Sequence, residues 1–193
     1  MRLSRLTVLT LPLVGSALIL ASCATLSKEQ CMVGDWQAIG YSDGVAGYYA
    51  DRLSLHAKAC AKAGVAPDYQ AWERGRQQGL KQYCSADNAF ALGRRGQPLN
   101  SVCSAEVSQR LQNINAQGRE YYALSNQLRE ARNQLKQYQT EYIKLRDGEM
   151  LNFKSEKEAR ARLLSLPARI RRLRQQIADN EAQLESLKRL SLY

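Results

Sequence analysis

The chain has 193 residues and a formal net charge of +10, from 28 basic and 18 acidic side chains. It contains one histidine and five cysteines, and no two cysteines have the short spacing that zinc sites favour, which argues against a zinc protein. The excess of positive charge is typical of a protein that meets an anionic partner.

The first 22 residues have the three parts of an export signal: two early arginines, an apolar run over residues 6–20, and small residues at its end. The run is shorter than the roughly 20 residues that a membrane-spanning helix needs. The sequence that follows, Leu20-Ala21-Ser22-Cys23, resembles the lipobox of bacterial lipoproteins. The alternative is an ordinary secretory signal in which Cys23 falls at the end by chance.

The lipobox resemblance implies that Cys23 is lipidated, and it implies a cellular location. In such lipoproteins the cysteine thiol receives diacylglycerol, the signal is cut before the cysteine, and the new amino terminus is acylated. Cys23 would therefore carry covalent lipid, palmitate included, and residues 23–30 would form an anchor linker. Ala24 stands where lipoproteins of the inner membrane usually carry Asp. The resemblance thus implies lipid anchoring in the outer membrane, facing the periplasm.

Four cysteines remain when Cys23 is set aside, and an even number in an oxidising compartment predicts two disulfides. All four lie in residues 31–103, a Gly-rich and nearly neutral segment. Residues 104–193 contain no cysteine and carry 17 basic against 11 acidic residues. We therefore expect a small disulfide-bonded head over 31–103 and a separate arm over 104–193. The four cysteines are Cys31, Cys60, Cys84 and Cys103.

Two segments of the head begin with the same Asp-aromatic-Gln-Ala phrase, at Asp35 and Asp68, and each predicts a helix with Asp as its N-cap. Glycines recur inside both segments at helical spacing, and each costs about 1 kcal/mol relative to Ala in a helix. Close backbone approach between the two helices would compensate for this cost, with Trp36, Tyr69 and Trp72 packed around the contact. The glycines are Gly40, Gly44, Gly47, Gly75 and Gly79.

A further helix is expected between these two, over residues 54–64, with a serine cap at its first residue and a glycine stop at its last. If it runs back beside the first helix, it brings Cys60 towards Cys31. The turn-rich segment after Cys84 can fold back to place Cys103 beside it. The preferred pairing is therefore Cys31 with Cys60 and Cys84 with Cys103, and the other two pairings stay open.

The head carries an ordered series of cysteines, glycines, acidic residues and aromatic residues. The series is Cys31, Gly34-Asp35-Trp36, Gly40, Asp43-Gly44, Gly47, His56, Cys60, Pro67-Asp68, Gly75-Arg76, Gly79-Leu80, Tyr83-Cys84, Gly93, Gly96 and Val102-Cys103, continued by Gly118-Arg119 and Tyr122. This order resembles the bacterial lipoprotein family known as domain of unknown function number 2799, over residues 31 to about 124. Leu99 departs from it, because an aromatic residue is expected there. The resemblance implies architecture and address but no reaction, since the family carries no established activity.

The arm carries two heptad patterns, over residues 114–145 and 163–187. Two long amphipathic helices in succession predict an antiparallel helical hairpin, or coiled coil, so we expect the whole fold to be all-α. The core positions are Ile114, Tyr121, Leu124, Leu128, Ala131, Leu135, Tyr138, Tyr142 and Leu145 in the first pattern, and Leu163, Leu166, Ile170, Leu173, Ile177, Asn180, Leu184 and Leu187 in the second.

Break signals locate the turn of this hairpin. Asp147 and Gly148 are expected to end the first helix, and Ser155 with Glu158 offers a capping box for the second. Pro167 lies inside the second pattern and should kink the helix or restart it there.

Candidates for catalysis are weak. His56 is the only histidine, and Asp43 or Asp51 could orient it as a general base. No serine lies in a nucleophile motif and every cysteine has another role, so we interpret His56 as a packed or capping histidine, and Asp35 and Asp43 as a helix cap and a surface charge. We expect no enzyme, no bound metal and no cofactor beyond the lipid on Cys23. The alternative function is a ligand-binding lipoprotein with a pocket near His56 and Asp43.

Six arginines fall within one fifteen-residue stretch that contains no acidic residue. The stretch indicates either a solvated face of the coiled coil or a binding surface for an envelope protein, peptidoglycan or anionic lipid, since the planar guanidinium bonds two oxygens at once. Nucleic acid fits the charge but not the exported location. We therefore expect an outer-membrane lipoprotein that acts as a periplasmic envelope scaffold or adaptor through its arm. The arginines are Arg160, Arg162, Arg169, Arg171, Arg172 and Arg174.

Overall fold

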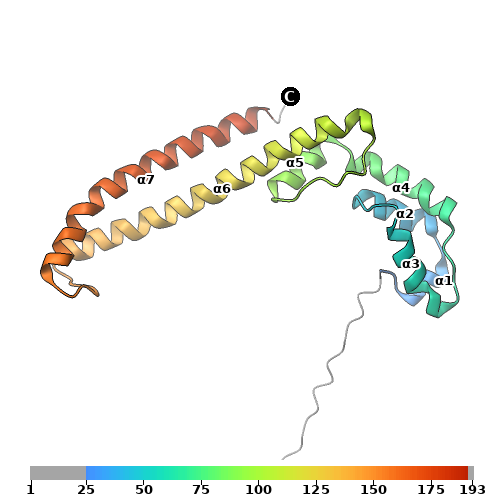
Figure 1. Ribbon diagram of the computed structural model, residues 1–193, viewed down its shortest axis with the longest axis horizontal. Helices are drawn as coiled ribbons and strands as arrows, with labels where there is room; N and C mark the ends of the chain where they lie inside the picture. The colour runs from blue at the N-terminus through green and yellow to red at the C-terminus, as the bar shows by residue number, and fades with distance from the viewer. Residues whose placement is uncertain (1–24, 191–193) are drawn as a thin grey trace, which may run out of the picture.

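The computed structural model describes residues 25–190, so the export signal and Cys23 lie outside the described residues. Every regular element in the described range is a helix, which confirms the all-α prediction. Short helices form a head, and the two longest helices form an arm that extends away from it (Figure 1). The elements are α1 (Lys28–Val33), α2 (Trp36–Val45), α3 (Arg52–Cys60), the 3-10 helix η1 (Ala61–Ala63), α4 (Tyr69–Tyr83), α5 (Ala86–Arg94), α6 (Ala105–Arg146) and α7 (Glu156–Leu190).

Side-chain caps begin the helices where the sequence predicts them. The carboxylate of Asp35 accepts a 3.0 Å hydrogen bond from the backbone N–H at the third position of α2, and that of Asp68 does the same in α4. Helix α3 differs from the prediction, because it begins at Arg52 rather than after a cap at Ser54. The Ser54 hydroxyl instead donates to the carbonyl of Asp51 at 2.7 Å, inside the first turn.

Helices α2 and α4 cross with their backbones in contact, as the glycine spacing predicts. A Cβ added to Gly40 would collide with the backbone carbonyl of Trp72, and one added to Gly75 would collide with that of Gln37. Trp36 and Trp72 are buried beside this crossing. Tyr69 was expected there too, but it lies in the first turn of α4 and its side chain is 59% exposed.

A second crossing of the same kind joins α5 to the start of α6. A Cβ on Gly93 would collide with the carbonyl of Asn115, and a Cβ on Gly118 would lie 2.9 Å from the Cα of Gly93. The Asn115 amide donates 3.0 Å hydrogen bonds to the carbonyls of Ala89 and Gln97. The composition change at residue 104 therefore marks the start of α6, whereas the first turns of that helix pack into the head.

Two disulfides join the cysteines in the preferred pairing, Cys31–Cys60 and Cys84–Cys103, which excludes the other two pairings. Each bridge lies in a hydrophobic core of its own. The first core contains Leu26, Cys31, Trp36, Cys60 and Trp72, and the second contains Leu80, Tyr83, Ala89, Leu99 and Leu111, with Cys84 and Cys103 packed against it.

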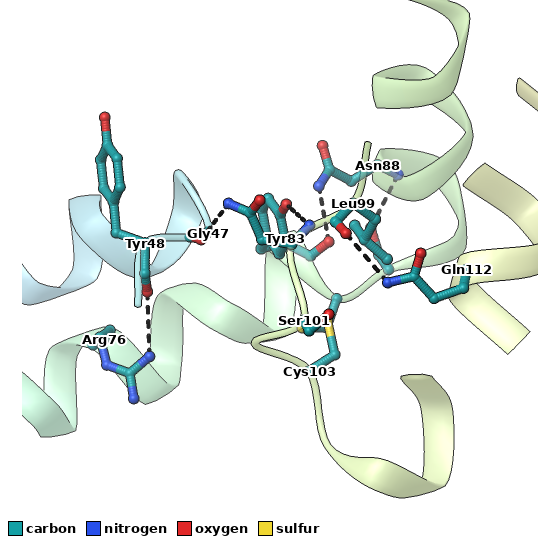
Figure 2. Close-up of a disulfide and its surroundings, with 12 residues drawn as sticks. Gly47, Tyr48, Arg76, Tyr83, Asn88, Leu99, Ser101, Cys103 and Gln112 are labelled. Carbon is teal, nitrogen blue, oxygen red and sulfur yellow. Dashed lines mark hydrogen bonds between the residues drawn. A yellow bond between two sulfur atoms is a disulfide. The ribbon is translucent and has the colours of Figure 1, made fainter. Parts of the chain in front are cut away.

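The loop between α5 and α6 is held down by hydrogen bonds around the second disulfide, as Figure 2 shows. The Tyr83 hydroxyl accepts a 2.9 Å bond from the backbone N–H of Asn100, and burial raises the pKa of Tyr83. The Asn100 amide donates to the carbonyl of Gly47 at 3.0 Å, and Gln112 on α6 donates to the carbonyl of Leu99 at 3.2 Å. These bonds connect α2, α4 and α6, so the base of the arm is built into the head.

The rest of α6 pairs with α7 as an antiparallel hairpin, which confirms the predicted arm (Figure 1). Two buried clusters hold the pair, and their members are predicted seam residues apart from Ala159 and Phe153 near the turn. One cluster contains Leu145, Ala159 and Leu166 with Tyr138, Tyr142, Phe153 and Leu163, and the other contains Leu124, Leu128, Leu184 and Leu187 with Tyr121 and Ile177.

Pro167 does not divide the second arm helix, because α7 is continuous from Glu156 to Leu190. Proline has no backbone N–H, so the carbonyl of Leu163 receives no helical hydrogen bond from this position. The predicted restart at Pro167 is therefore not observed. No helix in residues 25–190 combines the length and the apolar character that crossing a bilayer requires.

Candidate functional sites

His56 and Asp43, the predicted pair, meet in the interior of the head. The Nε2 atom of His56 on α3 lies 2.7 Å from Oδ2 of Asp43 on α2, and the histidine is 1% exposed. The same oxygen accepts a 2.8 Å hydrogen bond from Nε1 of Trp72 on α4. Asp51, the other candidate partner, is exposed at the start of α3. Asp43 is 6% exposed, so the prediction that it is a surface charge was wrong, and its buried carboxylate joins three helices.

The second ring nitrogen of His56 is bound by the chain segment that precedes α1. Its Nδ1 lies 2.7 Å from the hydroxyl oxygen of Thr25. Arg52 lies near the other oxygen of Asp43, at 3.7 Å, with its guanidinium 4.2 Å from the ring centroid of Tyr48. All polar atoms of the imidazole are therefore occupied by protein groups.

This hydroxyl–imidazole–carboxylate series has the connectivity of a nucleophilic triad. The histidine is 1% exposed, whereas Thr25 is partly exposed. The His56 ring is enclosed by Thr25, Asp43 and the helices that carry them, which leaves it no free nitrogen for a ligand. What the network does is fasten the first described residues to α2, α3 and α4.

A second buried polar group lies on α4, at a position that the sequence indicated only as part of the family series. Arg76 is 8% exposed, and its guanidinium donates to both carboxylate oxygens of Glu73, at 2.7 and 2.8 Å. This bond lowers the pKa of Glu73. Arg76 also donates to the carbonyl of Tyr48 at 3.4 Å (Figure 2). Besides its place in the family series, the i,i+3 spacing of an acidic and a basic residue is the sequence feature that indicated this pair.

The six predicted arginines all lie on α7, and the structure separates one of them from the other five. Arg162 donates two 2.7 Å hydrogen bonds to the carboxylate of Glu141 on α6, which raise the pKa of Arg162. It therefore belongs to the contact between the arm helices. The other five side chains are exposed, and none forms an ion pair with any residue that the structure describes: Arg160, Arg169, Arg171, Arg172 and Arg174.

An open groove of about 500 Å³ lies beside these arginines, between α6 and α7. Tyr142, Ile143, Pro167 and Ile170 give it an apolar floor, while Arg171 and Arg174 lie on its edge. The heptad pattern assigned Tyr142 and Ile170 to the seam, and it gave no sign that the seam is partly open here. A further apolar side chain on the same helix, Leu164, is 74% exposed.

We refer to the five exposed arginines as the arginine face. Between residues 133 and 175, where both helices approach the hairpin turn, the chain holds eleven basic and five acidic residues. The arm is therefore most positive in its distal half. Within residues 25–190 no three His, Cys, Asp or Glu side chains are grouped so as to hold a metal ion.

Comparison with known families confirms the resemblance found in the sequence. Residues 35–120 match the model of the family described as "Protein of unknown function (DUF2799)". The matched segment contains α2 to α5 and the first turns of α6, so it includes both glycine crossings and ends where the arm leaves the head. No curated protein and no solved structure shows significant similarity to the chain.

Proposed function

We propose that this chain, whose residues 35–120 match the DUF2799 family model, is an outer-membrane lipoprotein that acts as a periplasmic scaffold or adaptor and not as an enzyme. Lipid on Cys23 anchors it, the head forms a rigid base, and the arm presents the arginine face to an anionic partner. The lipid is the only non-protein group that this function needs.

The observation that carries the proposal is the arginine face. Solvated faces of coiled coils usually mix both signs of charge, because opposite charges on neighbouring turns stabilise the helix. Here residues 160–174 contain six arginines and no acidic residue, and only Arg162 is neutralised by the facing helix. Four of the five exposed arginines, Arg169, Arg171, Arg172 and Arg174, lie within two turns of α7 and repel one another, and an anionic partner removes that repulsion.

Arginine in place of lysine narrows the chemistry of the partner. The guanidinium is planar and bonds two oxygens of a carboxylate or phosphate at once. An acidic envelope protein, the carboxylates of peptidoglycan and the phosphates of anionic lipid all offer such oxygens. The apolar floor of the groove beside Arg171 and Arg174 favours a partner that also brings apolar surface.

The dimensions of the arm suit an adaptor. At 1.5 Å per residue, the 42 residues of α6 span about 60 Å, and the arginine face lies in the half of the arm that is distant from the head. A lipid-anchored head would leave this face free to reach a partner away from the membrane to which Cys23 is attached. The alternative function, a ligand pocket near His56, has no comparable support because both ring nitrogens are already bonded.

Binding to anionic surfaces tests the proposal. Arg169, Arg171, Arg172 and Arg174 are changed together to Gln, and co-sedimentation is measured with peptidoglycan, with anionic lipid vesicles and with an acidic envelope protein fraction. A matched control changes four exposed basic residues elsewhere, Arg74, Lys81, Arg110 and Arg119, to Gln. Both variants lose the same net charge, so only the position of the charge differs.

We expect the arginine-face variant to lose binding to at least one of these surfaces by several-fold, while the control variant binds like the parent. Raised salt should weaken binding of the parent, because it screens exposed charges. If both variants behave alike with all three surfaces, the arginine face is a solvated face and the adaptor function is wrong. Replacing Cys23 by Ser tests the anchor separately, since the parent should partition into detergent and the variant should not.

A further inference from the structure

The chain is fixed to the head almost immediately after Cys23. Thr25 bonds to the ring of His56 at 2.7 Å, and Leu26 is buried in the core that holds Cys31, Cys60 and Trp72. Ser27 then caps α1 through a reciprocal pair of hydrogen bonds with Gln30. The stretch 23–30 was predicted to be an anchor linker, whereas its described part, residues 25–30, is built into the head.

This attachment limits how far the head can lie from a lipid on Cys23. Thr25 follows Cys23 by two positions, and two extended residues span at most about 7 Å. The polar layer on each side of a bilayer is about 5 to 8 Å thick. Thr25 therefore lies no farther from the acyl chains than the outer limit of the headgroups, and the surface of the head around Thr25 must touch the membrane.

The surface next to this point has the chemistry of a membrane-contacting face. Helix α1 turns Cys31 inward and exposes two apolar side chains, Met32 at 63% and Val33 at 78%. It packs against α3 and η1, and these elements, like the start of α1, expose lysines. Exposed apolar side chains with basic ones on the same and neighbouring elements are typical of segments that lie in an anionic membrane interface, and the one acidic side chain of α1, Glu29, is also exposed. The lysines are Lys28, Lys58 and Lys62.

We propose that the head lies flat on the lipid surface through α1, with Met32 and Val33 in the headgroup layer and the three lysines facing anionic headgroups. This inference rests on the proposed lipid on Cys23. Figure 1 places α1 and α3 at the end of the head where the described chain begins, while α5 and the start of α6 lie at the other end. The hydrogen bonds of Thr25, His56 and Asp43 thus hold the segment next to Cys23 against the head. They thereby set the orientation of the head on the membrane and the direction of the arm.

Photo-crosslinking to lipid in membranes from cells that export the full chain tests this orientation. A benzophenone amino acid replaces Val33 in one protein and the exposed Arg110 of α6, at the other end of the head, in a second. A third protein carries the Val33 probe and ten Gly and Ser residues inserted between Ala24 and Thr25. The insertion leaves the head contacts in place but gives the tether a reach of about 17 Å. Retention of each protein in salt-washed membranes is measured alongside the yield of lipid adduct.

We expect lipid adducts at position 33 to exceed those at position 110 by several-fold, and the insertion to reduce the yield at position 33 several-fold. Equal yields at positions 33 and 110 in retained protein would overturn the orientation and leave the anchor standing. An unchanged yield after the insertion would overturn the role of the short tether. Loss of the parent chain from washed membranes would reject the anchor as well, and the retention measurement identifies that case.

Discussion

The head and the arm hold their helices together in opposite ways. In the head, α2 meets α4 and α5 meets α6 with backbones in contact at glycine positions, so no side chain separates the two helices at these points. In the arm, α6 and α7 are separated by a layer of Leu, Ile and Tyr side chains. The first arrangement is stiff and accepts no added atom at its contact points, whereas the second can accept exchanges of similar volume.

The difference indicates a division of labour. The head fixes positions, because two disulfides, two glycine crossings and a buried carboxylate network all act within about 90 residues. The outer surface of the arm contributes little to its own stability and is therefore free to carry charge. Four substitutions test this contrast, beginning with the largest expected effect.

Replacing Gly40 by Leu should abolish the crossing of α2 and α4. Even a single Cβ at this position collides with the Trp72 carbonyl, and a backbone carbonyl cannot move aside as a flexible side chain can. We expect the head to lose its fold while the distal arm stays helical. Hydrogen exchange resolved by segment measures this as lost protection in α2 and α4 and retained protection in the distal halves of α6 and α7.

Gly64 provides the matched control for this substitution. It has a left-handed φ of +69° and open space around its Cβ position. Asn adopts left-handed backbone more readily than other residues with side chains, so Gly64→Asn should leave the head folded. A folded Gly40→Leu head, or an arm that melts together with it, would contradict the contrast between the two regions.

Replacing Leu166 by Ala should destabilise the arm by about 2 to 5 kcal/mol, because Leu166 is completely buried in the cluster near the hairpin turn. Leu164, two residues earlier and 74% exposed, is the control and should cost under about 0.5 kcal/mol when changed to Ala. Thermal unfolding followed by circular dichroism measures both. Equal effects of the two substitutions would show that the seam has been misplaced.

Replacing Asp43 by Asn should cost about 1 to 3 kcal/mol. The carboxylate accepts hydrogen bonds from His56 and Trp72 on one oxygen, and the amide that replaces the other oxygen points an N–H group toward Arg52. Asp51→Asn is the control, because Asp51 is exposed and should change stability by under about 0.5 kcal/mol. Denaturant unfolding compares the two variants. If Asp43→Asn leaves the free energy of unfolding unchanged, the carboxylate does not stabilise the head.

The smallest expected effect is the pH dependence that comes from Glu73. Its bond to Arg76 lowers its pKa, so the unfolded chain binds a proton more readily than the folded one. The stabilisation is present above the ordinary Glu pKa of about 4.3 and is lost as the pH falls through the lower folded value. Glu73→Gln should therefore be less stable than the parent near pH 7, and the difference should shrink as the pH falls below the ordinary Glu pKa. If the stability difference between the parent and Glu73→Gln grows as the pH falls, the pKa of Glu73 is raised by folding and not lowered.

Much of the fold was predictable because its determinants are local in the sequence. Asp35 and Asp68 cap helices through side chains three residues from their partners, and the heptad spacing of Leu128, Leu166 and Leu184 fixes which face of each arm helix is buried. An even set of cysteines and the order of short helices favoured the observed disulfide pairing but left the other two pairings open.

The parts that sequence did not predict depend on the distance between elements. Asn115 is a polar residue in a long helix, and only the crossing of α5 and α6 shows that its amide binds two carbonyls from the α5 region. Tyr69 follows a helix cap like Trp36, yet it faces solvent because of its rotation about α4. Thr25 gave no sign in the sequence that it would reach His56, 31 residues away.

The candidate sites likewise have features that the sequence predicts and features that only the fold shows. The arginine cluster is visible as composition, but its split into Arg162 and five exposed side chains requires the position of Glu141 on the facing helix. The pairing of His56 with Asp43 was one of two alternatives, and the fold selects it by placing α2 and α3 on either side of the same core.

Crosslinking from the arm in living cells tests the proposed function most directly. A benzophenone amino acid is placed at Gln175, exposed beside the arginine face, or at Gln78, exposed on the head. We predict that position 175 captures an anionic envelope component, that Gln substitution of Arg169, Arg171, Arg172 and Arg174 reduces this adduct several-fold, and that the head control with the same charge change does not. An adduct that survives loss of the arginines, or capture from position 78 but not from position 175, would contradict an adaptor that works through its arm.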